Sequence, residues 1–594
     1  MNIIPTPKKI EMGNGSFSLC ETKILLNEKN DSRLTYHAHT LRSEIEALTN
    51  TFVKVAAREK CSCKNIYISH DNKEDEGYTL TITDKNIEIS GNSAAGAFYG
   101  IQTLRQIIKD YGRDIPVCTV TDKPDMQSRG FYHDVTRGKV PTLEQLKKIA
   151  DKLAYFKINS LQLYVEDAFD FEELDGVMEK YEVLTAKEII ELDDYCYNNF
   201  IEFVPSLSTF GHLYNLLQSE KYKHLCEFEN YVPREHYWPE KMGHHTIDVS
   251  NDESIEVIKS LIDQYVPLFR SNKFNICCDE TFDLCQGKNR GKDKGEAYFG
   301  FLMKIINHLK SKGKTVMMWG DIVLEHPEKM SELPEGTIML NWSYDSQPNE
   351  ENVKTFAKAG LPQIVCPGTS TWNRFVEEID RSAPNICKLA EYGYENGAIG
   401  LLNTNWGDFG NTCSFNCSLY GMLIGAEKSW NIKGELTPEF EQKASFLLYD
   451  KKDVNVIDMI IRLGRCERTC EWVNLVYWYS ERYCIGNKEK GLHVESCYEN
   501  VQNWKKADIL AEEFRKLGDD ERFTDLRLAA EMISFLNRLF MRVNGAEEFA
   551  DTEKIQKEFN EWFKEYEAAW LRDNKKSQIG KIKEFMDEVV TIIL

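Results

Sequence analysis

The sequence lacks the short motifs that mark nucleotide, serine-hydrolase and zinc sites. It contains no Walker A loop, no G-x-G-x-x-G, no G-x-S-x-G and no C-x-x-C pair. Cysteines recur as Cys61-x-Cys63, Cys413-x-x-x-Cys417 and Cys466-x-x-x-Cys470, and these spacings do not suit a structural zinc ion. We therefore expect no metal ion and no organic cofactor, and we exclude nucleotide-dependent enzymes and serine hydrolases.

Long apolar runs are also missing. No segment approaches the roughly 18 apolar residues of a membrane span, and residues 1–20 lack an apolar core of signal-peptide length. The 17 cysteines are odd in number, and many lie inside apolar segments, where cysteine behaves as a small hydrophobic residue. The sequence thus predicts a cytoplasmic protein with reduced thiols and no membrane partner.

Positive charge is scarce relative to negative charge. The chain has 73 Lys and Arg against 95 Asp and Glu, which gives a formal net charge of -22 and a pI near 5.2. Such a surface repels phosphate, so nucleic acid is excluded as a partner and a neutral or cationic substrate fits better.

The first 123 residues have the pattern of a small α+β domain. Segments 64–69, 78–83 and 86–90 alternate polar and apolar residues as half-buried strands do, and 94–108 has helical periodicity. Residues 116–124 are expected to form a linker. We predict an N-terminal α+β domain over 1–123.

Helical periodicity dominates the other end of the chain. Pro438 is the last proline, and segments 454–483, 498–517, 525–543 and 554–571 read as helices. We predict a C-terminal α-helical domain over 436–594. Within it, four aromatic residues recur at helical spacing, which suits either a core inside the chain or a homodimer contact: Trp562, Phe563, Tyr566 and Trp570.

The middle of the chain, 124–435, alternates strand-like and helix-like segments. Eight apolar runs are candidate strands: 130–135, 160–165, 201–207, 274–278, 315–319, 337–342, 363–366 and 399–404. Eight strand-helix units over this length predict an α/β fold of the (β/α)8 TIM barrel type. The longest insertion, 209–245, follows the third strand and is rich in aromatic residues, which suits a loop over an active site.

Acidic and aromatic residues follow these strands at their carboxyl ends. The fourth strand runs into the adjacent acids Asp279 and Glu280, where a barrel places its active site. Four of the 11 tryptophans follow the last four strands: Trp319, Trp342, Trp372 and Trp406. Aromatic faces pack on the CH groups of sugars while carboxylates accept their hydroxyls, so these residues predict a carbohydrate site.

Together these residues resemble the N-acetyl-β-hexosaminidases of glycoside hydrolase family 20, in particular a bacterial cytoplasmic branch with a helical C-terminal domain. Asp279-Glu280 matches the family's adjacent Asp-Glu pair. The resemblance implies substrate-binding roles at further positions: Arg129 in Ser-Arg-Gly-Phe-Tyr-His-Asp134 for sugar hydroxyls, His212 in Phe-Gly-His, Trp319, Trp342 and Trp406 around the acetamido group, and Asp408 for outer hydroxyls.

The resemblance implies an exo-acting hydrolase of terminal β-linked GlcNAc or GalNAc. Adjacent residues on a strand point in different directions, so Asp279 and Glu280 cannot flank the anomeric carbon as two carboxylates of an ordinary retaining glycosidase do. A substrate-assisted mechanism, in which the 2-acetamido oxygen is the nucleophile, fits instead. Glu280 would be the general acid and base, and Asp279 would hold the acetamido N–H.

The sequence departs from the family at two places. The family usually has a tyrosine after strand seven to bond the acetamido oxygen, but residues 369–373 contain none, so Trp372, Asn373 and Tyr344 remain candidates. The histidine-rich motif of strand two is replaced by 161–167. Two alternatives therefore stay open, namely a carbohydrate-binding barrel without turnover and a β-glycosidase for sugars without an acetamido group.

Overall fold

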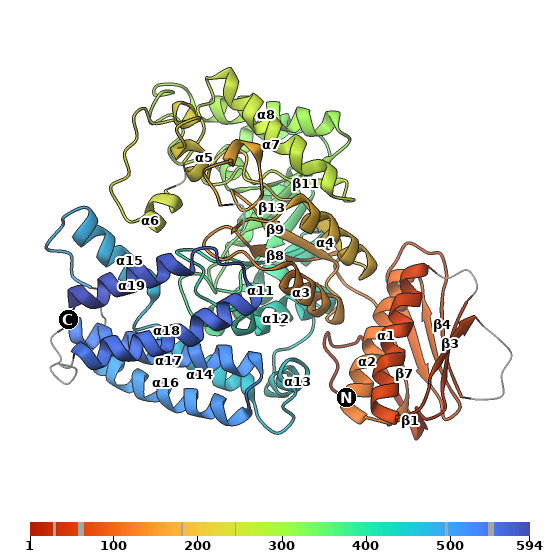
Figure 1. Ribbon diagram of the computed structural model, residues 1–594. Coiled ribbons are helices and arrows are strands. Elements are labelled where there is room, and N and C mark those ends of the chain that lie inside the picture. The colour runs from red at the N-terminus through yellow and green to blue at the C-terminus, as the bar shows by residue number, and fades with distance from the viewer. Residues whose placement is uncertain are drawn as a thin grey trace.

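The structure is a computed structural model that describes residues 1–27, 31–57, 64–179, 182–243, 245–492, 497–544 and 552–593. The pair Cys61-x-Cys63 lies outside these residues. Figure 1 shows an N-terminal sheet with two helices, a central barrel and a set of C-terminal helices. Among the helices of the described ranges, none combines the length and the apolar character that a membrane crossing requires.

A seven-stranded mixed sheet forms the N-terminal part. Its order is β1-β7-β5-β6-β4-β2-β3, with β1 Lys9–Ser18, β2 Lys23–Leu26, β3 Lys54–Ala57, β4 Asn65–His70, β5 Tyr78–Ile82, β6 Asn86–Gly91 and β7 Asp114–Asp122. Helices α1 (Ser32–Thr49) and α2 (Ala94–Tyr111) lie between this sheet and the barrel (Figure 1). Ser93 starts α2 because its hydroxyl accepts the Gly96 N–H.

Eight parallel strands form the barrel, as predicted. Their order is β10-β9-β8-β15-β14-β13-β12-β11, and a bridge between Ser206 and Asn275 joins the two ends. The bounds are β8 Ser128–Asp134, β9 Ser160–Tyr164, β10 Glu202–Val204, β11 Lys273–Asn275, β12 Thr315–Trp319, β13 Ile338–Trp342, β14 Gln363–Cys366 and β15 Gly400–Asn405. The fourth strand, β11, is shorter than expected because the backbone leaves the β region at Cys277 and Cys278.

Helices surround the barrel on its outer side. They are α3 Leu143–Tyr155, α4 Ala186–Asn198, α7 Asp252–Tyr265, α8 Lys294–Ser311, α9 Asp321–Glu325, α10 Glu350–Lys358, α11 Ile379–Glu395 and α12 Leu419–Trp430. Thr185 and Glu188 form a full capping box at the start of α4, and the Thr142 hydroxyl caps α3. Each such cap contributes about 1 kcal/mol to helix stability.

Large side chains fill the inside of the barrel. One buried cluster contains Tyr132, Tyr164, Val204, Cys277, Met317, Trp319, Ile338, Leu340, Ile364, Cys366, Leu402 and Trp406. Its aromatic members lie at or near the carboxyl ends of their strands, whereas most of the aliphatic ones lie deeper. The floor of any pocket at that end is therefore aromatic.

The C-terminal helices are α13 Pro438–Tyr449, α14 Val456–Glu467, α15 Trp472–Tyr479, α16 Cys497–Leu517, α17 Glu521–Val543, α18 Thr552–Asp573 and α19 Ile579–Ile593. The sequence pattern did not indicate α13 or α19. The single helix expected over 454–483 is two helices followed by a π-helical turn, Ser480–Cys484. It breaks after Glu467, whose carboxylate turns inward and accepts the Phe375 and Val376 N–H groups.

The aromatic cluster of α18 lies inside the chain. Trp562, Phe563, Tyr566 and Trp570 are all buried, and the Trp562 and Tyr566 rings stack 4.6 Å apart. The Tyr566 hydroxyl donates to the Thr412 carbonyl, 3.0 Å away, in the loop after β15. The cluster joins the helices to the barrel, so it is not available for the homodimer contact that the sequence left open.

Candidate active site

The carboxyl ends of the barrel strands open into one hollow of about 890 Å³. Asp279, Glu280 and the four tryptophans predicted from the strand ends all line it. The complete lining is Arg137, Met242, Asp279, Glu280, Trp319, Trp342, Tyr344, Trp372, Trp406, Asp408, Phe409 and Tyr477. The structure therefore brings most of the predicted site together.

A turn with unusual backbone geometry carries the acidic pair. Cys277, Cys278 and Glu280 have φ values of 57°, 64° and 48°, a region that costs free energy in residues other than glycine. The Tyr298 hydroxyl donates to the Cys278 carbonyl at 2.7 Å, and the Glu280 N–H donates to Asp321 at 2.9 Å. These bonds hold the turn so that two consecutive carboxylates reach the same imidazole.

That imidazole belongs to His212, in the loop after β10. Its Nε2 lies 3.5 Å from Asp279 Oδ2 and 3.4 Å from Glu280 Oε2, and the ring is buried. Burial acts to lower the pKa of His212, but the Asp279 and Glu280 carboxylates outweigh it and raise the pKa to about 10. His212 is therefore a cation at neutral pH that orients both acids.

The same three side chains could be considered as metal ligands, because their donor atoms all lie within 4.8 Å of one another. A protonated imidazole has no lone pair for a metal ion, and displacing its proton would cost the attraction of two carboxylates. The donor set therefore fits a hydrogen-bonded acid pair better than a metal centre.

Asp321 joins the pair from the end of β12. Burial, followed by the charge of Asp279, raises the pKa of Asp321 to about 7. Its Oδ2 accepts the Glu280 N–H, so it supports the left-handed conformation of Glu280. Asp321 begins α9 just after β12, and nothing local in the sequence distinguishes it from an ordinary acid at a helix N-terminus.

Aromatic rings form the floor and one side of the hollow. Trp319 and Trp406 are buried and lie 5.9 Å apart, whereas Trp342 is half-buried and stacks on Tyr344 at 5.1 Å. The Trp372 ring also lies 5.1 Å from the Tyr344 ring, tilted by 56°. The Tyr344 hydroxyl accepts the Trp406 indole N–H at 2.7 Å. Of the three residues left open for the acetamido oxygen, Tyr344 is the one with a hydroxyl inside this box.

Asp408 is paired with an arginine that the sequence analysis did not select. Arg137 Nη1 donates to Asp408 at 2.8 Å, and the guanidinium lies over the Tyr164 and Trp406 rings at 4.8 and 5.0 Å. Burial raises the pKa of Asp408 to about 6, although Arg137 opposes the shift. The carboxylate is therefore mostly ionised at neutral pH and close to its titration range.

The prediction that Arg129 binds substrate is wrong. Arg129 is the second residue of β8, so it lies at the amino end of the barrel, away from the hollow. Its guanidinium is fully buried, pairs with Glu76 at 2.7 Å, and donates to the Tyr99 hydroxyl at 2.9 Å. Arg137 was identifiable in the sequence, because it follows the carboxyl end of the same strand.

The insertion after β10 covers part of the hollow. It contains α5 (Tyr214–Gln218) and α6 (Tyr237–Met242), and Met242 lines the pocket. Lys241 is buried and donates to Asp167 at 2.8 Å, which fixes α6 to the end of β9. Tyr477 of α15 completes the lining. It could not be found from barrel spacing, because it lies beyond the last strand.

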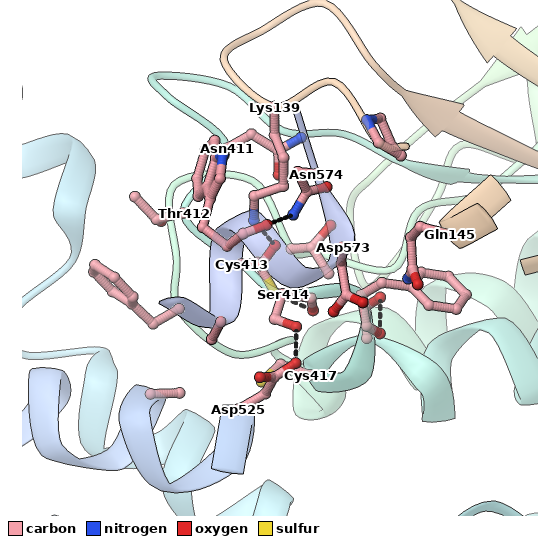
Figure 2. Close-up of a pocket in the computed structure, with 18 of the residues that line it drawn as sticks. Lys139, Gln145, Asn411, Thr412, Cys413, Ser414, Cys417, Asp525, Asp573 and Asn574 are labelled. Atoms are coloured by element: carbon pink, nitrogen blue, oxygen red, sulfur yellow. Dashed lines mark hydrogen bonds between the residues drawn. The ribbon is translucent and has the colours of Figure 1, made fainter. Parts of the chain in front are cut away.

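A second pocket lies between the barrel and the C-terminal helices (Figure 2). Lys139 donates to the Cys413 carbonyl at 2.7 Å, and Asp525 of α17 accepts from Ser414 at 2.5 Å. Burial lowers the pKa of Lys139 to about 8. Lys139 is partnered within the barrel, and Asp525 joins the C-terminal helices to the barrel, so the pocket is a polar joint. It contains none of the predicted site residues.

Two family models match the chain. The model of glycosyl hydrolase family 20, domain 2, matches residues 1–123, and the model of the glycosyl hydrolase family 20 catalytic domain matches residues 127–392. A beta-hexosaminidase of Porphyromonas gingivalis is 27% identical over 365 residues, which are 54% of this chain and 46% of the relative. A lacto-N-biosidase of Bifidobacterium bifidum is 24% identical over 443 residues, 70% of this chain and 36% of the relative. The chain thus spans less than half the length of these relatives.

Solved structures share the fold. The Flavobacterium johnsoniae chitobiase has a TM-score of 0.63 at 17% identity, with 94% of this chain and 96% of that chain covered. A Streptomyces plicatus beta-hexosaminidase mutant in complex with the product GlcNAc has a TM-score of 0.61 at 18% identity, with 75% and 94% covered. Over the covered parts, the chain therefore has the same fold as those proteins.

Proposed function

Because this chain belongs to glycoside hydrolase family 20, we propose that it is an exo-acting N-acetyl-β-hexosaminidase that removes terminal β-linked GlcNAc or GalNAc. One observation carries the proposal. Asp279 and Glu280, consecutive in sequence, both contact His212 beside a box of tryptophans closed by Tyr344. An acid pair of this kind suits a substrate that supplies its own nucleophile.

The first step breaks the glycosidic bond. Glu280 gives its proton to the glycosidic oxygen as the bond to the anomeric carbon breaks, and the acetamido oxygen attacks that carbon from the opposite side. The product is an oxazolinium ion and a free leaving alcohol. Asp279 accepts the acetamido N–H and stabilises the positive charge that develops on the ring.

The second step uses water. Glu280, now a carboxylate, takes a proton from a water molecule, which attacks the anomeric carbon and reopens the oxazolinium ring. Two inversions give net retention of configuration, and Glu280 recovers its proton. His212 contacts the carboxyl groups of both Asp279 and Glu280 and keeps them oriented, whether Glu280 carries its proton or not.

The aromatic box selects the acetamido group. We place the acetamido methyl group against the rings of Trp342, Tyr344 and Trp372, above the floor of Trp319 and Trp406. The Tyr344 hydroxyl donates to the acetamido oxygen, which turns this oxygen toward the anomeric carbon. It can do so while it still accepts from Trp406.

Asp408 and Arg137 bind the outer hydroxyls of the same sugar. An ionised carboxylate accepts two hydroxyls, and the guanidinium holds it at 2.8 Å in a fixed orientation. The pair blocks further extension of the glycan on that side, which is consistent with removal of one terminal sugar at a time.

A cytoplasmic location remains part of the proposal. Fourteen cysteines whose side chains the structure describes are free thiols, and most of them are buried, which suits a reducing compartment. Cell fractionation with an antibody against the protein tests this. Recovery of the protein only outside the cytoplasm would contradict it.

Hydrolysis of chromogenic β-GlcNAc, β-GalNAc and β-glucose substrates, with and without a thiazoline mimic of the oxazolinium ion, tests the activity. We expect turnover of the acetamido sugars alone, blocked by the thiazoline. Glucoside turnover at a comparable rate would instead support a glycosidase that ignores the acetamido group. Binding of GlcNAc without any turnover would support a carbohydrate-binding barrel.

A further inference from the structure

The second barrel strand is followed by two acids that the proposed reaction does not use. Glu166 and Asp167 come after β9, in the segment that replaces the family's histidine-rich motif. Both side chains are buried, and neither lines the hollow. A buried carboxylate costs free energy unless it is paired, so the partners of these two acids indicate their role.

Glu166 faces the guanidinium that holds Asp408. Its Oε1 lies 3.6 Å from Arg137 Nε and accepts the Tyr164 hydroxyl at 2.7 Å. Arg137 Nε is buried and makes no hydrogen bond within the described residues, so Glu166 supplies the opposite charge on this side of the guanidinium. On the other side, Arg137 Nη1 donates to Asp408 at 2.8 Å. Arg137 is thus held between two carboxylates.

The insertion after β10 supplies the next charge. Lys241 of α6 is 3% exposed, and its Nζ lies 3.4 Å from Glu166 Oε2 and donates to Asp167 at 2.8 Å. The same Nζ donates at 3.3 Å to the carbonyl of Thr136, the residue before Arg137. Lys241 therefore contacts the Arg137 segment both directly and through Glu166.

These contacts form one row of alternating charge from the wall of the hollow to the insertion: Asp408, Arg137, Glu166, Lys241 and Asp167. Burial raises the pKa of Glu166, whereas Lys241 and Arg137 act to lower it. The two cations therefore favour the ionised form of Glu166, and loss of Lys241 would favour the neutral acid. A neutral Glu166 would no longer attract the guanidinium.

We propose that Lys241 and Glu166 are positioning residues that hold the Arg137 guanidinium where it orients Asp408 toward the outer hydroxyls of the terminal sugar. The inference rests on the proposed function, in which Asp408 and Arg137 bind those hydroxyls. A guanidinium that is fixed on both sides loses less rotamer entropy when the sugar binds. The insertion thus contributes a buried cation to the site as well as Met242 to its lining.

The test uses two substrates that differ only in the outer hydroxyls. Wild type, Lys241→Met and Glu166→Gln are assayed on a chromogenic β-GlcNAc substrate and on its analogue without the 4- and 6-hydroxyl groups. We expect each variant to lose about tenfold in kcat/KM on the complete sugar, equal to about 1.4 kcal/mol, and to match wild type on the deoxy analogue. If the analogue is not turned over, inhibition constants of the complete and deoxy thiazolines give the same comparison.

Two further variants test whether the residues act together. The double variant Lys241→Met/Glu166→Gln should lose no more than the larger of the two single losses, because both residues act through Arg137. Lys241→Arg keeps the charge and should retain most of the kcat/KM on the complete sugar. If Lys241→Met does not fold, Glu166→Gln alone carries the comparison, because glutamine keeps the size of Glu166 and an acceptor for Tyr164.

Lys157→Met is the matched control. Lys157 is another buried lysine paired with a carboxylate, Asp122 at 3.5 Å, but it precedes β9 and therefore lies at the amino end of the barrel. Its replacement should lower the melting temperature. At a temperature where this variant is folded, its kcat/KM on both substrates should match wild type.

Equal losses on the complete sugar and the deoxy analogue would make Lys241 and Glu166 merely structural and would overturn the proposal. Variants as active as wild type on both substrates would also overturn it. Fully additive losses in the double variant would show that the two residues act separately, against the proposal. If wild type cleaves neither substrate, the proposed function itself fails. Wild-type cleavage without a selective loss in the variants removes the positioning role alone.

Discussion

Two arginines separated by eight positions lie at opposite ends of the same barrel strand. Arg129, at the amino end of β8, is enclosed by Glu76, Tyr99 and backbone carbonyls, and it has no exposed surface. Arg137, past the carboxyl end, holds Asp408 in the wall of the open hollow. The first links the barrel to α2 and to the loop before β5 of the N-terminal part, and the second belongs to the site.

One end of this strand therefore serves stability, and the other end serves function. At the amino end of the barrel, each nitrogen of the Arg129 guanidinium has a partner within the protein, and the side chain has no exposed surface for a ligand. At the mouth, the carboxylates can still accept further hydrogen bonds, and the backbone of the acid pair is strained. Neither feature stabilises the fold. Mutations at the amino end should therefore lower stability, whereas mutations at the carboxyl end should lower activity.

The largest loss of activity is expected from mutations of the acid pair at the carboxyl end of the barrel. Glu280→Gln should lower kcat on acetamido substrates by about a thousandfold, because the leaving oxygen is no longer protonated. Asp279→Asn should cost about a hundredfold or more, because the acetamido group and the developing charge lose their carboxylate. Steady-state kinetics with β-GlcNAc substrates measures both, and unchanged thermal unfolding shows that the fold is intact. An Asp279→Asn enzyme as active as wild type would exclude the substrate-assisted mechanism.

At the amino end of the barrel, the largest effect of a mutation should be on stability. Arg129→Met leaves the Glu76 carboxylate unpaired and several buried carbonyls without a donor, which should cost about 3–5 kcal/mol of unfolding free energy. Urea denaturation measures this cost. At a temperature where the variant is folded, its kcat/KM should stay near wild type. A folded Arg129→Met protein without activity would place Arg129 in the site after all.

The same conservative substitution at both arginines sharpens the contrast. Arg137→Lys keeps the charge but loses the planar fork that holds Asp408, so we expect about a thirtyfold loss of kcat/KM, equal to about 2 kcal/mol. Arg129→Lys is the matched control and should lower the melting temperature without this kinetic loss. Equal kinetic losses at both positions would remove the distinction drawn here.

A smaller kinetic effect is expected from a single hydroxyl of the box. Tyr344→Phe removes the acceptor of the Trp406 indole and the donor for the acetamido oxygen, and it should lower kcat/KM about tenfold. Tyr132→Phe removes another buried hydroxyl, bonded to Ser206 deeper in the barrel at 2.8 Å, and serves as the control. It should alter unfolding rather than kcat/KM. The reverse pattern would reassign the acetamido contact.

The smallest effect is a pH dependence that only the mouth should show. Burial raises the pKa of Asp408 to about 6, so kcat/KM should fall severalfold as the pH decreases through this value and the carboxylate is protonated. Stability changes in the opposite sense. A raised folded-state pKa means that Asp408 contributes stability below its unfolded pKa near 4 and loses it as the pH rises through about 6.

Asp321 titrates nearby, with a pKa of about 7, so Asp408→Asn is needed to separate the two. In this variant the acidic limb of kcat/KM near pH 6 should disappear, on top of an overall loss of activity. A limb that persists unchanged would assign it to Asp321 or the acid pair.

The strand pattern allowed most of the barrel and its mouth to be predicted. Eight apolar runs correspond to β8–β15, and placing the residues after each strand in one pocket correctly grouped the acid pair and four tryptophans. The grouping was correct because all strands of the barrel are parallel, so the residues that follow each strand lie at the same end. Arg129 was misplaced because a motif match was preferred over its position at the amino end of the strand.

Other features had no local signal. Tyr477 reaches the hollow only through the packing of α15 on the loop after β15, which no periodicity encodes. β11 is short because the backbone is left-handed at Cys277 and Cys278. Neither residue is a glycine, so the sequence gives no signal of this conformation. Contacts between distant segments, and strain held by them, are known only once the chain is folded.

The two cysteines before the acid pair also determine how the protein responds to thiol reagents. Burial raises the pKa of Cys277 to about 12 and also raises that of Cys278, so both remain unreactive thiols although they adjoin Asp279. An alkylating reagent should therefore modify the exposed Cys484 long before it reaches them. Alkylation of Cys277 and Cys278, followed peptide by peptide by mass spectrometry, would thus report opening of the barrel itself and could serve as a built-in unfolding sensor.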